Sequence, residues 1–143
     1  MRACFSNAVT VDLALSLSAD VGYLDLTDER LQGLLARIRR VANIDIGGNS
    51  YARVEERVQG HPWHHDTGTS RHMSWCRYTA GVLLTDPTTF DGGGFYFRDA
   101  PDSPVHHYLD LMVWDSAPEN EHCVTSNSGG RKVLIMFFGE SDE

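Results

Sequence analysis

The stretch His61-Pro62-Trp63-His64-His65-Asp66 holds two metal-binding residue types two positions apart, at His64 and Asp66. Residues i and i+2 of an extended segment point to the same side of the backbone, so this imidazole and carboxylate would project together. His65 would point to the other side. Two protein ligands leave a metal ion with an incomplete coordination sphere, and His122, in Glu121-His122-Cys123-Val124, is a third candidate. The sequence therefore predicts a metal site formed by His64, Asp66 and His122.

Two histidines and one carboxylate on the same side of a metal form the facial arrangement of non-haem Fe(II) oxygenases, in which the opposite positions stay open. A His-x-Asp spacing by itself is common, and it also fits a turn in which the Asp66 carboxylate caps a loop. The other histidines favour the metal site. The chain has seven, and three of them fall between His61 and His65.

Length and composition indicate one globular domain. The 143 residues are enough for one core, and 41% hydrophobic with 22% charged residues is ordinary for such a domain. The net charge of −8 argues against a nucleic-acid partner, because nucleic-acid binding depends on clustered lysine and arginine. Residues 8 to 17 are apolar but are interrupted by Asp12, so we expect neither a signal peptide nor a membrane span.

The three cysteines, Cys4, Cys76 and Cys123, are odd in number and lack a CxxC spacing. This pattern favours neither a disulfide framework nor a thiolate zinc site. The sequence therefore fits the reducing cytoplasm, and we expect a monomer or a small homo-oligomer.

The first 49 residues are expected to form a helical support. Residues 1 to 6 fit a short strand, whereas residues 7 to 26 combine strand-like alternation with helix-forming residues and stay open between the two. A helix should begin after Thr27 or Asp28, which can both cap its N-terminus, and end near Asn43. Its apolar positions recur at helical spacing at Leu31, Leu34, Leu35, Ile38 and Val41.

From Ser50 onward the chain changes to short strands separated by turns. One helix followed by seven or eight strands predicts an α+β fold that is mainly β, with the helix packed on a sheet of a sandwich or jelly roll. The strand core should span residues 50 to 139. The expected strands are residues 53–58, Trp75–Leu84, Gly94–Phe97, Leu109–Trp114 and Arg131–Phe138.

The order of these motifs resembles the prolyl 4-hydroxylase-like branch of the 2-oxoglutarate and Fe(II)-dependent oxygenases, whose core is a double-stranded β-helix of jelly-roll type. The resemblance depends on order and spacing between Val54 and Phe138. The matching segments are His64-His65-Asp66, Arg77–Leu84, Asp91-Gly92-Gly93-Gly94-Phe95-Tyr96-Phe97, Leu111–Ser116, His122-Cys123-Val124 and Gly130–Phe138.

The resemblance implies that His64, Asp66 and His122 bind Fe(II), and that Arg131 pairs with the distal carboxylate of 2-oxoglutarate. A guanidinium can meet a carboxylate through two parallel hydrogen bonds, which suits this role. Val133, Ile135 and Phe137 share the face of Arg131, so this face of the strand should be the interior. Family members often add a tyrosine hydroxyl to the same carboxylate. The corresponding positions here lie near Glu56 or Arg57 and at Leu83, which leaves Thr79 as the candidate polar helper.

Several neighbouring residues are expected to have structural roles. The glycines from Gly92 to Gly94 should shape a hairpin. The three tryptophans should lie in the core or in a pocket wall. We expect His61, His65 and His72 to be solvated loop residues, and the segment from Pro101 to Tyr108, which includes His106 and His107, to be a surface connection.

The resemblance implies a dioxygenase that uses Fe(II), 2-oxoglutarate and O2, with ascorbate as a further candidate cofactor, to hydroxylate a C–H bond. Retention of the Asp66 carboxylate favours hydroxylation over halogenation. The branch acts on prolyl residues in proteins or on free amino acids, and a short chain with few insertions favours an open site and a peptidyl target. The alternatives are a non-catalytic metal or 2-oxoglutarate sensor, and a cupin-type dioxygenase without a keto acid.

Overall fold

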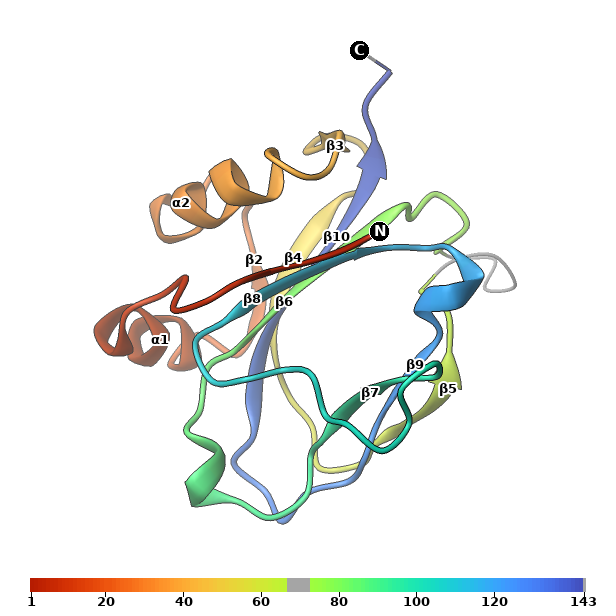
Figure 1. Ribbon diagram of the computed structural model, residues 1–143. Helices are drawn as coiled ribbons and strands as arrows, with labels where there is room; N and C mark the ends of the chain where they lie inside the picture. The colour runs from red at the N-terminus through yellow and green to blue at the C-terminus, as the bar shows by residue number, and fades with distance from the viewer. Residues whose placement is uncertain (67–72, 143) are drawn as a thin grey trace.

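A computed structural model describes residues 1–66 and 73–142 (Figure 1). These residues form two helices, both within the first 38 positions, and ten strands. Short 3-10 turns occur at Pro87–Thr89 and Pro118–Asn120. The elements in chain order are β1 (Arg2–Phe5), α1 (Val11–Ser18), β2 (Gly22–Leu24), α2 (Glu29–Ile38), β3 (Ile44–Asp45), β4 (Tyr51–Glu56), β5 (His61–His64), β6 (Tyr78–Leu83), β7 (Phe95–Phe97), β8 (Leu111–Asp115), β9 (His122–Val124) and β10 (Lys132–Glu140).

The strands form two antiparallel sheets. The larger sheet has seven strands in the order β1-β8-β6-β10-β4-β2, with β3 paired to β10 beside this path. The smaller sheet has the order β5-β9-β7. In Figure 1, α1 and α2 cover the outer face of the larger sheet, and the smaller sheet lies on its other side. The expected mainly β fold with a helix packed on a sheet is confirmed, and the strands contributed by residues 1–49 join the larger sheet.

Side chains alternate between two buried environments along the central strand β10. Leu134, Met136 and Phe138 are fully buried in the cluster that includes both helices. Val133, Ile135 and Phe137 point to the opposite side and line a cavity between the sheets. The sequence predicted this second set as the interior face, and the structure shows that the first set is buried more deeply, because the helices cover the other face of the strand.

Residues 7 to 26, which the sequence left open between helix and strand, contain α1 and β2. The side chain of Thr10 caps α1 by accepting a hydrogen bond from the amide of Leu13 at 3.1 Å. Ala14 and Leu17 share the buried face of α1, whereas Leu15 is 61% exposed. The buried side chains of this segment therefore follow helical spacing, and the residues that alternate in the sequence do not share a buried face.

Helix α2 begins as predicted, because the Asp28 side chain accepts from the amide of Arg30 at 2.9 Å. It ends at Ile38, however, and the predicted end near Asn43 is wrong. Val41 is 38% exposed and adds nothing to the buried face. The chain has to turn after Ile38 so that Ile44 and Asp45 can pair with β10. Neither helix described here is long and apolar enough to cross a bilayer.

The packing of α2 on the larger sheet predicts an uneven response to truncation. Leu31 is fully buried, so Leu31→Ala should reduce the free energy of unfolding by about 2 to 5 kcal/mol. The matched control Leu15→Ala, on the exposed face of α1, should stay within roughly 0.5 kcal/mol of wild type. Urea denaturation measures both changes, and equal losses would contradict the packing described.

Candidate metal centre

Strand pairing brings the two histidines of the predicted site together. His64 ends β5, His122 begins β9, and the two residues are direct partners in the antiparallel register of the smaller sheet. Their ring centroids lie 4.3 Å apart. Although 58 positions separate them in the sequence, the pairing of these two short strands fixes them side by side.

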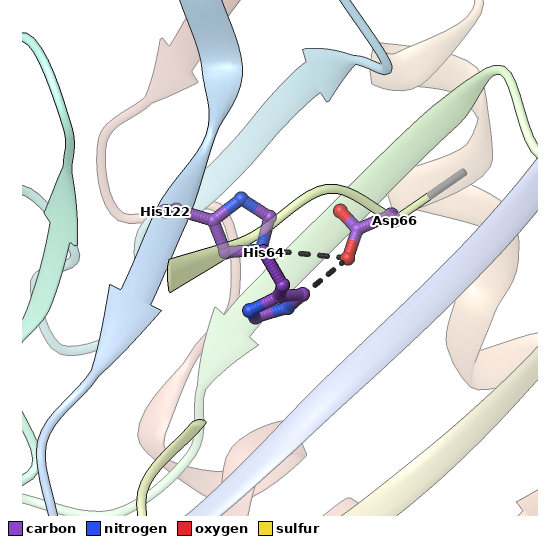
Figure 2. Close-up of side chains that lie close together, drawn as sticks. All are labelled: His64, Asp66 and His122. Carbon is purple, nitrogen blue, oxygen red and sulfur yellow. Dashed lines mark ion pairs between the residues drawn. The ribbon is translucent and has the colours of Figure 1, made fainter. Parts of the chain in front are cut away.

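Asp66 completes the cluster from the segment that follows β5. Its Oδ1 atom lies 3.5 Å from Nε2 of His64 and 3.4 Å from Nε2 of His122 (Figure 2). One ligand atom from each of the three residues lies within 4.8 Å of the others. An ion bound at about 2.1 Å from each of two ligand atoms leaves them roughly 3 to 3.5 Å apart, so the cluster suits one shared ion.

The second nitrogen of each imidazole is already bonded to the backbone. Nδ1 of His64 lies 2.7 Å from the carbonyl oxygen of Pro62, and Nδ1 of His122 lies 2.8 Å from that of Asn120. A carbonyl oxygen only accepts hydrogen bonds, so Nδ1 carries the proton in both rings. Each Nε2 then presents a lone pair, which is the tautomer that a metal ligand needs.

The second oxygen of Asp66 is also occupied. Oδ2 accepts a hydrogen bond from Thr79 Oγ1 at 2.9 Å and another from Trp114 Nε1 at 2.9 Å. Thr79 lies on β6 and Trp114 on β8, so the larger sheet fixes the orientation of a carboxylate that follows the smaller one. These contacts leave Oδ1 available for a cation.

Electrostatics keep the Asp66 carboxylate ionised. Its burial opposes the charge, but contacts with His122, His64 and Thr79 lower the pKa of Asp66 well below its ordinary value. Burial also disfavours a charged His64, yet contacts with Asp66 and the Pro62 carbonyl raise the pKa of His64. The cluster therefore offers a cation one anionic oxygen and two imidazole nitrogens.

The cluster opens into the cavity between the two sheets. Arg131, immediately before β10, is only 9% exposed and lines the same cavity. A Cβ atom at Gly93 would lie 2.5 Å from Cδ of Arg131, and Gly93 has a φ of +71°. Glycine is therefore needed at position 93 both for the turn and for the approach of the arginine side chain. The described lining residues are Arg53, Glu55, Arg57, His61, His64, Asp66, Gly81, Phe95, His106, Trp114, His122, Val124, Arg131, Val133, Ile135 and Phe137.

The Arg131 guanidinium has unused bonding capacity. Its Nε atom is buried without a hydrogen-bond partner in the described part of the chain. Burial lowers the pKa of Arg131, an effect that the charge of Glu55 partly offsets. A buried guanidinium that lacks its full set of partners is stabilised by an anion, and a carboxylate matches its geometry. Arg131 could therefore hold a carboxylate in this cavity.

Other predicted residues lie at different places. Thr79, the expected helper for the keto acid, bonds to Asp66 and is not among the described residues that line the cavity. Leu83 is also outside the described lining. His61, expected as a solvated loop residue, lies in β5 and lines the cavity, while His72 is outside the described residues.

The prediction that residues 101 to 108 form a surface connection is wrong for His106. This half-buried side chain lines the cavity, and its Nε2 lies 3.2 Å from the carbonyl oxygen of Gly81. A Cβ at Gly81 would lie 3.3 Å from His106 Cε1, so glycine permits this approach. Burial, followed by the charge of Arg131, lowers the pKa of His106 to about 4. No local pattern distinguishes His106 from the exposed His107.

Comparison with solved structures gives the class to which this fold belongs. No family model matches the chain, and no curated protein matches it in sequence. The structural matches include prolyl hydroxylases and a member of the 2-oxoglutarate and Fe(II) oxygenase family. The chain therefore has the jelly-roll fold of the prolyl-hydroxylase-like oxygenases, and the fold implied by the sequence resemblance is confirmed.

Three of these structures show how far the likeness extends. The viral collagen prolyl hydroxylase of Paramecium bursaria Chlorella virus-1, in its 2-oxoglutarate complex, has a TM-score of 0.73 at 12% identity, over 99% of this chain and 96% of that one. A prolyl-4-hydroxylase from Pseudomonas putida has a TM-score of 0.71 at 15% identity, over 98% and 92%. An oxygenase-family oxidoreductase from Burkholderia pseudomallei has a TM-score of 0.60 at 12% identity, over 99% and 85%.

The hydrogen bonds to Asp66 Oδ2 give a prediction for metal affinity. Thr79→Val removes one donor with little change in shape, Trp114→Phe removes the other with a smaller ring, and each should weaken Fe(II) binding by about 10- to 100-fold. Anaerobic calorimetric titration measures the Kd. Thr88→Val, in the exposed turn at Pro87–Thr89, is the matched control and should bind Fe(II) as wild type does. Unchanged affinity in both Thr79→Val and Trp114→Phe would show that these bonds do not orient Asp66.

Proposed function

We propose that this protein is an Fe(II)- and 2-oxoglutarate-dependent dioxygenase that hydroxylates a C–H bond of a prolyl or other amino-acid residue in a peptide or protein. One observation supports it above all. The Nε2 atoms of His64 and His122 converge with Oδ1 of Asp66, while every other polar atom of these side chains is bonded elsewhere. Such a facial set leaves the opposite positions of an iron ion open for reagents.

Different residues would bind the metal ion and the keto acid. His64, Asp66 and His122 would hold Fe(II), and Arg131 would anchor the distal carboxylate of 2-oxoglutarate in the same cavity. When bound, iron and keto acid supply the oxidising chemistry with O2, which gives succinate, CO2 and a hydroxylated substrate. The reducing cytoplasm, with ascorbate as an additional reductant, would keep the iron in the Fe(II) state.

Other side chains act by positioning. Thr79 and Trp114 hold Asp66 so that one oxygen faces the ion, and the carbonyls of Pro62 and Asn120 hold the two imidazoles. His106 is neutral near pH 7 because its pKa is lowered, so it adds no charge beside Arg131. The protein supplies orientation and charge, and the cofactors supply the reactivity.

The structural neighbours support a prolyl or other amino-acid target. Two of them are prolyl hydroxylases, one of which acts on collagen according to its name. The fold likeness supports the same reaction class here. A peptidyl target agrees with a chain whose length differs little from those of its neighbours.

An anaerobic titration with Fe(II) and 2-oxoglutarate tests this function. The proposal predicts a visible metal-to-ligand absorption band when both are present, and succinate after air is admitted. A band without succinate for any peptide offered would instead indicate a non-catalytic sensor. No band and no dependence on 2-oxoglutarate would indicate a cupin-type enzyme. The Asp66→Ala variant is the control, and it should give neither band nor succinate.

A further inference from the structure

Strand β4 sends two charged side chains into the cavity. Ala52 and Val54 face the helices and are buried, so Arg53 and Glu55 point to the opposite side. Arg57, just past the end of β4, also lines the cavity and is exposed. None of these three residues is part of the candidate metal cluster, and all three are distinct from Arg131, which is assigned to the keto acid.

Glu55 is already engaged on both oxygens. Oε2 accepts from Nη2 of Arg53 at 2.7 Å, and Oε1 lies 3.5 Å from Nε2 of His61. The hydrogen bond from His61 outweighs the effect of burial and, with the charge of Arg53, lowers the pKa of Glu55. Glu55 is therefore ionised at neutral pH, and it neutralises only one of the nearby arginines.

Both arginines keep donors for a further anion. The Arg53 side chain is 35% exposed, and its described hydrogen bond to Glu55 uses only Nη2. Arg57 donates to the backbone carbonyls of Gln59 at 2.9 Å and Gly60 at 3.3 Å, which are neutral acceptors. Neither contact compensates the charge of Arg57. The cavity thus has a positively charged wall that its own carboxylates do not balance.

The described residues that line the cavity carry a net positive charge. Three arginines, Arg53, Arg57 and Arg131, face two carboxylates, Glu55 and Asp66, which leaves one formal positive charge with the histidines counted as neutral. Fe(II) and the dianion of 2-oxoglutarate have opposite and equal charges, so loading both leaves this excess unchanged.

The excess is local, because the whole chain has a net charge of −8. Glu55 pairs with Arg53 and the keto acid is assigned to Arg131, so the charge left without a partner is that of Arg57. Arg57 is exposed, so an incoming carboxylate can reach it. The cofactors do not supply this carboxylate, and the substrate is the remaining component that could bring it.

We propose that the substrate presents a carboxylate to Arg53 and Arg57 next to the carbon that is hydroxylated. The proposal rests on the function proposed above and narrows its substrate class to prolyl compounds bearing a negative charge. The inner contact is with Arg53, and the outer contact is with Arg57 at the exposed end of the wall. The carboxylate can be the terminus of a proline compound or the side chain of an acidic residue beside the proline.

Two pairs of probes separate these sources in the anaerobic complex with Fe(II) and 2-oxoglutarate. N-acetylproline against N-acetylprolinamide tests a terminal carboxylate, and acetyl-Pro-Asp-amide against acetyl-Pro-Asn-amide tests a neighbouring acidic residue. Calorimetry should give a Kd lower by about tenfold or more for the charged member of one pair, as expected for charge-assisted hydrogen bonds.

Two variants test whether Arg53 and Arg57 cause the preference for the charged probe. Arg53→Gln and Arg57→Gln should each bring the ratio of the two Kd values close to one, while the Kd of 2-oxoglutarate stays within about twofold of wild type. Because Arg57 is exposed, its variant should fold even if Arg53→Gln does not. Arg40→Gln, an exposed arginine after α2, is the control and should keep the full preference.

Several outcomes would overturn the inference: no binding by either charged probe, equal affinities within both pairs, or a preference that survives both variants. Loss of 2-oxoglutarate binding in Arg53→Gln would assign this residue to the co-substrate and would also refute it. The same probe titrations on metal-free protein, compared with the Fe(II) and 2-oxoglutarate absorption test, distinguish the two proposals. If the protein prefers the charged probe but gives no absorption band with Fe(II) and 2-oxoglutarate, the anion site is supported and the dioxygenase function is refuted.

Discussion

Arg131→Met is expected to raise the Kd of 2-oxoglutarate by at least about 100-fold, because a partly desolvated pair of charges loses one partner. The Kd of Fe(II) should not change, since Arg131 is not part of the metal cluster. Anaerobic calorimetry with each ligand in turn measures both constants. A parallel loss of Fe(II) binding would show that Arg131 supports the metal site rather than the keto acid.

The same variant has a second expected effect that needs no ligand. Burial without a full set of partners lowers the pKa of Arg131, which means that the folded protein destabilises its charged form. Replacing it by an apolar side chain of similar length should leave the free energy of unfolding unchanged or increase it. A stability loss of several kcal/mol, measured by urea denaturation, would identify Arg131 as a structural residue.

His122→Ala is expected to weaken Fe(II) binding by more than the roughly 100-fold that loss of a supporting hydrogen bond costs, because it removes a ligand itself. Succinate formation should fall with it. His107→Ala is the matched control, since His107 lies on the surface and outside the described cavity lining. Retention of tight Fe(II) binding in His122→Ala would mean that the ion is held elsewhere.

Local pattern explains a large part of the fold. Alternation along β10 and the spacing of two between His64 and Asp66 depend only on neighbouring residues, so they can be read from the sequence. The end of α2 cannot be read in this way. Val41 continues the helical spacing, but the pairing of β3 with β10 requires the chain to leave the helix at Ile38.

The surroundings of the candidate metal site depend on contacts between distant residues. Trp114 donates to Asp66 across 48 positions, and His106 reaches Gly81 across 25. A buried tryptophan usually places its N–H on an acceptor, which is the one signal that could have indicated Trp114. Nothing in the segment around His106 indicates its direction, since that depends on how the loop returns across β6.

The three clustered side chains are connected to both layers of the molecule. His64 and His122 are on β5 and β9 of the smaller sheet, whereas Asp66 is held by Thr79 of β6 and Trp114 of β8 in the larger sheet. A cation bound to all three would fix Asp66, and the hydrogen bonds from Thr79 and Trp114 would transmit this restraint to the larger sheet. Chelation would remove that restraint, while the packing of Phe95 and Phe97 against Trp114 would still join the two sheets.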